Sequence, residues 1–364
     1  MPRAGLAPEQ VMRFRDGETQ FLRDFSVSEG LGPRFNSSSC GGCHHRPVIG
    51  GDGAIYRGAL HYGADLRAAM AVESRWSGAV EAWAEAQGGG TFVGLAPSGS
   101  LAHNRHLDGA APDRVPRAAD AMSLRKVTDL RGAGLIEAIP DAMILANARA
   151  RGRHPSVSGR AVRDEAGRVA RFGSQLQIPT DLALAAARTF EVELGLDASE
   201  LAVLRSRRGL AVTHAVADFV RFLEVPPSEP SARDARRPEV RRGRMLFQEI
   251  GCTDCHRPSY TLPDGRVVQP YSDFLLHDMG PALDDGVALG SARASEYRTA
   301  PLWGVGDRGT KLLHDGRGAN LEKTVLWHGG EGAAARAAFL GLSREDQMAM
   351  REWIKALGAP MAGG

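Results

Sequence analysis

Apolar residues recur at helical spacing in six segments of the chain. A spacing of three to four residues places such side chains on one face of a helix. The predicted helices are residues 9–25, 65–87, 180–195, 212–224, 238–250 and 343–357. Thr180 or Asp181 is expected to cap the third of these helices and Ser343 the last, because their side chains can accept hydrogen bonds from the first turn.

The segments between these helices carry turn residues and no period. Residues 97–120 are rich in Gly, Pro, Asp and Arg, which predicts a surface loop. Short hairpins are predicted for residues 261–267 and around Glu165-Ala166-Gly167. The fold class is therefore predicted to be mainly α, with long loops and short hairpins.

A proline-rich stretch, Pro226-Pro227-Ser228-Glu229-Pro230, is the clearest linker in the chain. It predicts an N-terminal domain of residues 1–225, a linker of residues 226–237 and a C-terminal domain of residues 238–364. The two outer helices of the C-terminal domain are expected to pack together along apolar stripes. The stripes consist of Val240, Met245, Leu246, Phe247 and Ile250 on one helix and Met348, Trp353, Ile354 and Leu357 on the other.

The composition is that of a globular chain. It has 364 residues, of which 43% are hydrophobic and 24% are charged, so it is long enough for two domains. A net charge of +2 does not favour nucleic acid or acidic membranes as partners. The chain lacks an apolar run of 18 residues, so no transmembrane segment is expected. An aromatic content of 6% suits a loop-rich protein whose cofactors supply part of the core.

The four cysteines all lie in two copies of the motif C-x-x-C-H, which is the attachment signature of haem c. The two thiols of each copy add to the vinyl groups of a porphyrin, and the adjacent histidine reaches the iron. These residues are Cys40, Cys43 and His44 in the first copy and Cys252, Cys255 and His256 in the second. Two covalently bound haem c groups are therefore predicted.

Other uses of the cysteines explain the two motifs less well. A zinc site would leave the histidine after each cysteine pair without a role. A redox C-x-x-C pair needs a βαβ context, and a disulfide across two residues is strained. Because haem c is attached outside the cytoplasm in bacteria, the protein is expected to be periplasmic. Residues 1–5 contain no apolar signal-peptide region, so a leader is expected to have been removed.

Several motifs resemble the di-haem oxidoreductase family, also called thiol oxidoreductases or putative peroxidases. That family is related to the bacterial di-haem cytochrome c peroxidases and to the di-haem enzymes that mature methylamine dehydrogenase. The motifs are residues 30–36 with 40–44, 134–141, 271–281, 313–317 and 328–331. The resemblance covers nearly the whole chain. It implies two cytochrome c-like domains with one haem c each, and some relatives hold calcium between the domains.

The resemblance also implies a second ligand for the C-terminal haem iron. In the relatives this ligand follows the histidine of an aromatic-His-Asp-Gly motif by fourteen residues. This chain has Leu313-His314-Asp315-Gly316, and the fourteenth residue after His314 is His328. His256 and His328 would then form a bis-histidine, electron-transfer haem. Met279 is the alternative ligand, and capping a helix end is the alternative role of His328.

The N-terminal haem, held by His44, is expected to carry out the chemistry. The resemblance makes Glu137 the candidate general acid/base, although a structural pairing of Glu137 with an arginine is an equal alternative. The distal position could instead be filled by His61, His103, His106 or His154. A tryptophan that follows Phe-Gly in the relatives is replaced here by Ser174, which leaves Trp303 as another electron route.

A weak internal repeat supports two related halves. Residues 126–134 resemble residues 298–306, with a leucine and a G-x-G sequence at the same offset in both. A haem motif lies upstream of each copy. The repeat therefore predicts that the same element faces each haem.

The predicted function is that of a periplasmic di-haem oxidoreductase with a peroxidase-like activity. An external donor, a small cytochrome or cupredoxin, reduces the C-terminal haem, and electrons pass to the N-terminal haem. A peroxide or a similar small oxidant is reduced there. Two alternatives stay open: a non-enzymatic electron carrier with both irons six-coordinate, and an oxidase of a protein or organic substrate.

Overall fold

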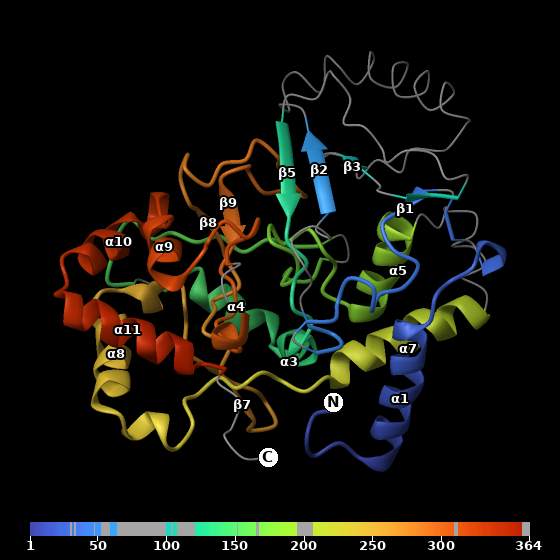
Figure 1. The fold of residues 1–364 in the computed structure, drawn as a ribbon, viewed down its shortest axis with the longest axis horizontal. Coiled ribbons are helices and arrows are strands. Elements are labelled where there is room, and N and C mark those ends of the chain that lie inside the picture. Colours follow the sequence, from blue (N-terminus) through green and yellow to red (C-terminus); the bar gives the residue numbers. More distant parts are fainter. Residues whose placement is uncertain are drawn as a thin grey trace.

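The computed structural model shows a mainly helical protein with a few small antiparallel sheets (Figure 1). It describes residues 1–29, 31–32, 34–46, 48–51, 59–63, 100–102, 105–107, 121–150, 152–164, 167–194, 207–308 and 312–358. None of the helices within these ranges has the length and the apolar character needed to cross a membrane. The predicted fold class is confirmed.

The described helices comprise five that were predicted (α1, α5, α7, α8 and α11) and four short ones that were not (α3, α4, α9 and α10). They are α1 (Pro8–Leu22), α3 (Ala133–Ala138), α4 (Asp141–Asn147), α5 (Leu182–Glu193), α7 (Arg207–Phe222), α8 (Pro238–Glu249), α9 (Leu321–Leu326), α10 (Ala333–Leu340) and α11 (Arg344–Ala356). Asp181 caps α5, since its carboxylate accepts from the N–H groups of Ala183 and Leu184. Ser343 caps α11 through the N–H of Asp346. The helix predicted for residues 65–87 lies outside the described residues.

The strands are short and pair antiparallel. They are β1 (Arg34–Phe35), β2 (Ala59–Gly63), β3 (Ser100–Ala102), β4 (Arg105–His106), β5 (Ala121–Arg125), β6 (Tyr260–Thr261), β7 (Val267–Val268), β8 (Leu276–Asp278) and β9 (Glu296–Arg298). The sheets have the orders β3-β2-β5, β1-β4, β6-β7 and β8-β9. The β6-β7 hairpin and a bridge between Arg163 and Val169 confirm the two predicted hairpins.

The prediction of a structureless loop over residues 97–120 is wrong at β3 and β4. These strands are three and two residues long, which is too short for a period to appear in the sequence. Their hydrogen-bond partners are β2 and β1, which lie far away along the chain. Tertiary pairing therefore stabilises a segment whose local composition favours a loop.

Two helix pairs cross with the same geometry, α1 with α7 and α8 with α11 (Figure 1). Gly17 of α1 packs on the backbone of α7, where an added Cβ would lie 2.1 Å from the carbonyl oxygen of Ala215. Gly243 of α8 meets the carbonyl oxygen of Ala349 in α11 at the same 2.1 Å. Because glycine has no side chain, both pairs approach more closely than any other residue permits.

Aromatic rings complete each crossing one helical turn further along. Phe21 lies 4.6 Å from Phe219 between ring centres, and Phe247 lies 4.6 Å from Trp353. In each half the aromatic residue follows the glycine by four positions, as does its partner relative to the alanine. The two crossings are thus copies of one helix-pairing unit.

The crossing at Gly243 also corrects part of the predicted interface between α8 and α11. Met245 and Met348 were expected in the apolar stripes, but they are 53% and 43% exposed. Gly243 turns the face with Val240, Leu246 and Phe247 inward, and Met245 lies outside that face. On α11 the buried methionine is Met350, which is 1% exposed.

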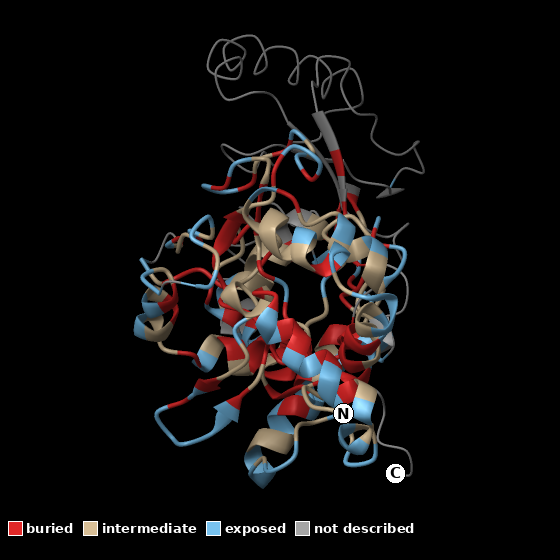
Figure 2. Ribbon diagram, turned by 90° about the vertical axis from the view of Figure 1, so that its left-hand side faces the viewer, coloured by how far each residue is buried: buried red, intermediate tan, exposed pale blue. Residues whose placement is uncertain are grey.

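The hydrophobic core consists of three main clusters, and Figure 2 shows buried residues on the inward faces of the elements that form them. The first cluster joins α1, α5 and α7, and the second joins α8 and α11. The third combines Ile136, Ile139 and Ile144 with Tyr260, Phe274 and Trp303. Residues from both predicted domains share this third cluster, and the division at residues 226–237 stays a prediction.

Candidate haem sites

The second C-x-x-C-H motif begins immediately after α8. Gly251 adopts a left-handed conformation (φ 84°) that ends the helix, and Cys252–Asp254 form a single 3-10 turn. Cys252 and Cys255 form no disulfide. The ring of His256 lies with Nδ1 2.9 Å from the carbonyl oxygen of Tyr271. This bond orients the ring and leaves Nε2 available to ligate a metal, an arrangement that metal-binding histidines use.

The ring of His328 lies opposite the ring of His256. His328 follows α9, and its Nδ1 lies 2.9 Å from the carbonyl oxygen of Thr324. This bond is also the helix-end cap that was the alternative role for His328. Because the bond occupies Nδ1, Nε2 is left for a ligand, as in His256. Desolvation lowers the pKa of both histidines, that of His256 to about 4, so both rings are neutral and able to ligate at pH 7.

The separation of these two rings fits one iron between them. Their centres are 6.5 Å apart, and their planes are inclined by 47°. A metal–imidazole bond of about 2.0 Å on each side, plus the half-width of each ring, places trans imidazole centres roughly 6 to 6.5 Å apart. Met279, the alternative ligand, has its terminal methyl group against Gly332, beside His328.

The first motif repeats the proximal half of this arrangement. Nδ1 of His44 lies 3.1 Å from the carbonyl oxygen of Gly51. The ring centre of Phe21 is 6.3 Å from that of His44, and Phe247 is 6.0 Å from His256. The helix-pairing unit of each half therefore places one aromatic ring beside the proximal histidine.

The weak internal repeat in the sequence is a true structural repeat. Leu130 donates its N–H to the carbonyl of Gly50, one residue before the carbonyl that holds His44. Leu302 donates to the carbonyl of Pro270, one residue before the carbonyl that holds His256. The same leucine of each copy therefore supports the loop that orients each proximal histidine. The two segments thus have equivalent contacts, and the prediction that each faces a haem stays a prediction.

The G-x-G sequence of each copy has the same role. Gly132 and Gly304 both have positive φ, 83° and 65°. An added Cβ at Gly134 would lie 2.1 Å from the carbonyl oxygen of Arg221 in α7. At Gly306 it would lie 2.1 Å from that of Lys355 at the end of α11. Each repeat thus connects its histidine loop to the last turn of its own helix pair.

Comparison with known protein families finds one match, which covers the second site. Residues 203–357 match the family described as "Di-haem oxidoreductase, putative peroxidase". This part of the chain is therefore similar to that family. The match contains the second motif and His328, and it confirms the resemblance drawn from the sequence motifs. The family supports a di-haem redox role with haem as the cofactor.

Two solved structures show a weaker likeness. One is Kuenenia stuttgartiensis hydrazine synthase, with 16% identity and a TM-score of 0.45, covering 98% of this chain and 90% of that chain. The other is a MauG-like protein associated with microbial copper homeostasis, with 16% identity and a TM-score of 0.34, covering 55% of this chain and 77% of that chain. No curated protein matches the chain.

The four cysteines of the chain do not gather into a zinc site. Burial raises the pKa of Cys40 and of Cys252 to about 12, which is unlike the low pKa of a redox-active pair. Within the described residues, the only group of three potential metal ligands is Cys255, Asp273 and His277. That group contains one cysteine, whereas a zinc site built from the two motifs would need both pairs.

Glu137, the candidate acid/base, is engaged in an ion pair. Its Oε2 lies 2.7 Å from Nε of Arg221, and its Oε1 lies 3.1 Å from Nη2 of Arg221. Oε1 also accepts the N–H of Leu182 at the start of α5. The hydrogen bond with Glu137 is the largest cause of the raised pKa of Arg221. The arrangement is therefore the arginine pairing, and a catalytic role for Glu137 stays a prediction.

The four histidines considered for the first distal position have different surroundings. His154 lies beside the second motif, with Nε2 3.1 Å from the carbonyl oxygen of Ile250 and its N–H bonded to Asp254. His61 is on β2 and His106 is on β4, but the orientation of their side chains is not described. His103 lies outside the described residues. The distal ligand of the first site thus stays open.

Sequence reasoning missed a buried charged cluster next to the second motif. Nε2 of His277 lies 2.9 Å from Asp273, and its Nδ1 lies 2.7 Å from Glu331 and 3.5 Å from Sγ of Cys255. Burial alone would lower the pKa of His277, but its bonds to Asp273 and Glu331 raise it well above 6.5. Asp273 lies in the motif of residues 271–281, and Glu331 lies in that of residues 328–331. These two family motifs were the signal from which the cluster could have been predicted.

Proposed function

We propose that the protein is a periplasmic di-haem c-type oxidoreductase that passes electrons from its second site to its first. The observation that carries this proposal is the pair His256 and His328, whose ring centres are 6.5 Å apart with both Nδ1 atoms bonded to backbone carbonyls. His256 and His328 would together hold the iron of a haem bound between them. A bound haem there supplies reversible one-electron redox chemistry, with no open position for a substrate.

Trp303 is the proposed connection between the two sites. Its ring packs on Gly132, where an added Cβ would lie 2.4 Å from the ring. Gly132 lies two residues after Leu130, which supports the histidine loop of the first site. Trp303 itself follows Leu302, which supports the histidine loop of the second site. One buried aromatic ring thus bridges the repeated elements that hold His44 and His256.

The first site is the proposed place of reduction of a peroxide or a similar small oxidant. Reduction of hydrogen peroxide takes two electrons and two protons and releases two molecules of water. The electrons come from an external donor, a small cytochrome or cupredoxin. Glu137 is the proposed proton carrier, and leaving Arg221 would free its carboxylate to exchange a proton.

Replacing Glu137 with glutamine tests this step. If Glu137 moves a proton, we expect peroxide turnover to fall about 100-fold or more, since a positioned acid/base contributes at least that much. Asp218→Asn is the matched control, because Asp218 is the other carboxylate bonded to Arg221. Equal turnover in the two variants, both correctly folded, would restrict Glu137 to its structural ion pair.

Low-temperature EPR of the ferric protein, repeated after half-reduction, tests the assignment of the two sites. We expect a low-spin bis-imidazole signal from the second site. We expect the iron of the first site to have an open coordination position, either from the start or after half-reduction. In His328→Ala the bis-imidazole signal should disappear while both haem groups stay attached. A low-spin second site with unaltered ligand bands in His328→Ala would contradict the assignment.

The ion pair of Glu137 favours one alternative function, a non-enzymatic electron carrier. Both oxygens of this carboxylate have hydrogen-bond partners, which it would have to leave in order to carry a proton. A carrier would show two low-spin signals that persist on half-reduction. It would also lack peroxide turnover.

A further inference from the structure

We propose that Glu331, through its hydrogen bonds to two neighbouring segments, holds His328 in place as the distal ligand of the second haem. These hydrogen bonds of Glu331 are called the latch below. Glu331 is a positioning residue in this proposal, since it acts through a segment that ends three residues after His328. The inference rests on the proposed function, in which His328 binds the second iron. It adds a residue that decides how firmly that ligand is held.

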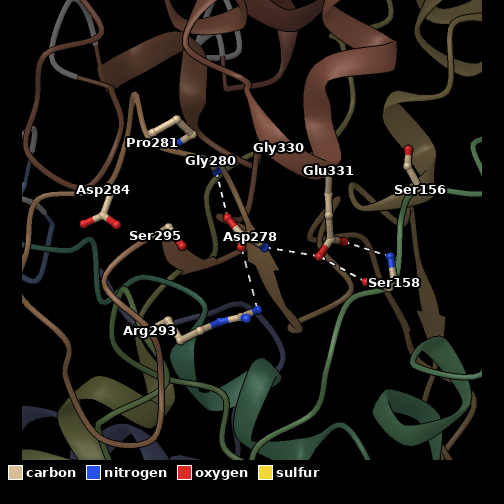
Figure 3. Close-up of a pocket in the computed structure, with 10 residues that line it drawn as sticks. All are labelled: Ser156, Ser158, Asp278, Gly280, Pro281, Asp284, Arg293, Ser295, Gly330 and Glu331. Carbon is tan, nitrogen blue, oxygen red and sulfur yellow. Dashed lines mark hydrogen bonds and ion pairs between the residues drawn. The ribbon is translucent and has the colours of Figure 1, made fainter. Parts of the chain in front are cut away.

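The carboxylate of Glu331 accepts hydrogen bonds from two separate segments of the chain. Its Oε2 lies 2.8 Å from the N–H nitrogen of Ser158 and 3.1 Å from that of Gly159. The same oxygen lies 2.7 Å from Nδ1 of His277, and Oε1 accepts from Ser158 Oγ and from the N–H of Asp278, each at 3.2 Å. Glu331 thus binds the segment around residue 158 and strand β8 at once (Figure 3).

The turn between His328 and Glu331 lies directly against the end of β8. An added Cβ at Gly329 would lie 2.7 Å from the carbonyl oxygen of Met279. At Gly330, which has a φ of 49°, it would lie 2.1 Å from that of Asp278. Two adjacent glycines therefore allow the turn to press on the strand, and Glu331 fastens it there.

The latch reaches the proximal side of the site through His277. Its Nε2 is bonded to Asp273, and the N–H of Asp273 donates to the carbonyl of Cys255 at 3.0 Å. Cys255 directly precedes the proximal ligand His256. A short series of hydrogen bonds thus connects the attachment motif on one side of the haem with the distal turn on the other.

Glu331 also lies where water can compete with its bonds. Its side chain is 13% exposed, and it lines a pocket of about 620 Å³ with Ser158, Asp278 and Arg293 (Figure 3). Opening the latch would release the turn into this pocket. The bond of His328 to Thr324 and the packing of α9 do not involve Glu331, so the ligand would loosen without unfolding of the helix.

Glu331→Gln tests the latch, with carbon monoxide as the probe. In glutamine an NH2 group replaces one of the two carboxylate oxygens. This group donates hydrogen bonds, so it cannot accept them from the N–H groups that it faces. We therefore expect carbon monoxide to bind the reduced second haem about tenfold faster or more, because a lost hydrogen bond to a charged group exceeds one factor of ten. The ferric bis-imidazole signal should weaken, and added imidazole should restore a low-spin iron. Ser158→Ala, which removes one weak donor, is the matched control and should resemble the wild type.

The outcomes separate the latch from the function on which it rests. A wild type without a bis-imidazole signal overturns both. A wild type with the signal, and a folded Glu331→Gln protein with unchanged carbon monoxide binding and spectrum, overturns the latch alone. If Glu331→Gln does not fold, Glu331→Asp decides, since it keeps the charge but is one methylene too short. An Asp variant whose low-spin signal persists on warming, as in the wild type, overturns the latch.

Discussion

The double substitution Cys252→Ala and Cys255→Ala is expected to halve the covalently bound haem, from two groups per chain to one. Neither cysteine is in a disulfide, and both lie at the turn that follows α8, next to His256. Without them the porphyrin has no covalent link at this site, although His256 and His328 remain. Purification under denaturing conditions should then remove the haem of the second site. The low-spin bis-imidazole signal should be lost with it.

The pyridine haemochrome assay, together with the mass of the denatured chain, measures this change. The matched control is Cys40→Ala with Cys43→Ala, which should also remove one haem but leave the low-spin signal of the second site. A variant that keeps both haem groups would contradict the assignment of the motif. Loss of a zinc ion in place of a haem would establish the zinc alternative.

Trp303→Phe is expected to slow electron exchange between the two sites and to lower the free energy of unfolding. Trp303 is 2% exposed and packs on Gly132, which continues from the loop that holds His44. Phenylalanine leaves a space against that glycine, which costs about 1–3 kcal/mol of stability. It also removes the indole contact with Gly132 that joins the two repeated elements.

The measurement is the rate at which an electron re-equilibrates after rapid half-reduction, followed by the absorption of each haem. Trp353→Phe is the control, since Trp353 is 1% exposed and the same volume is lost in the α8–α11 core. We expect a similar loss of stability in that variant but an unchanged exchange rate. Equal rates in Trp303→Phe and the wild type would exclude Trp303 from the route.

Much of the fold follows from local sequence. The helices α1, α5, α7, α8 and α11 have strong apolar periods, and the caps at Asp181 and Ser343 were readable because capping needs only a side chain and its own first turn. The strands β3 and β4 were missed because pairing with distant strands stabilises them. The exposure of Met245 and Met348 was missed because the close approach at Gly243 decides which face turns inward.

The features of the candidate sites also fall into those that local sequence predicts and those that depend on tertiary packing. Attachment chemistry is local, so the sequence alone determined the two C-x-x-C-H motifs, and a counted motif pointed to His328. Only the tertiary structure decided that His328 faces His256, that Glu137 pairs with Arg221, and that Glu331 joins β8 to the segment around residue 158. These contacts connect residues far apart along the chain. Their distances depend on how the helices and turns pack, which no local pattern encodes.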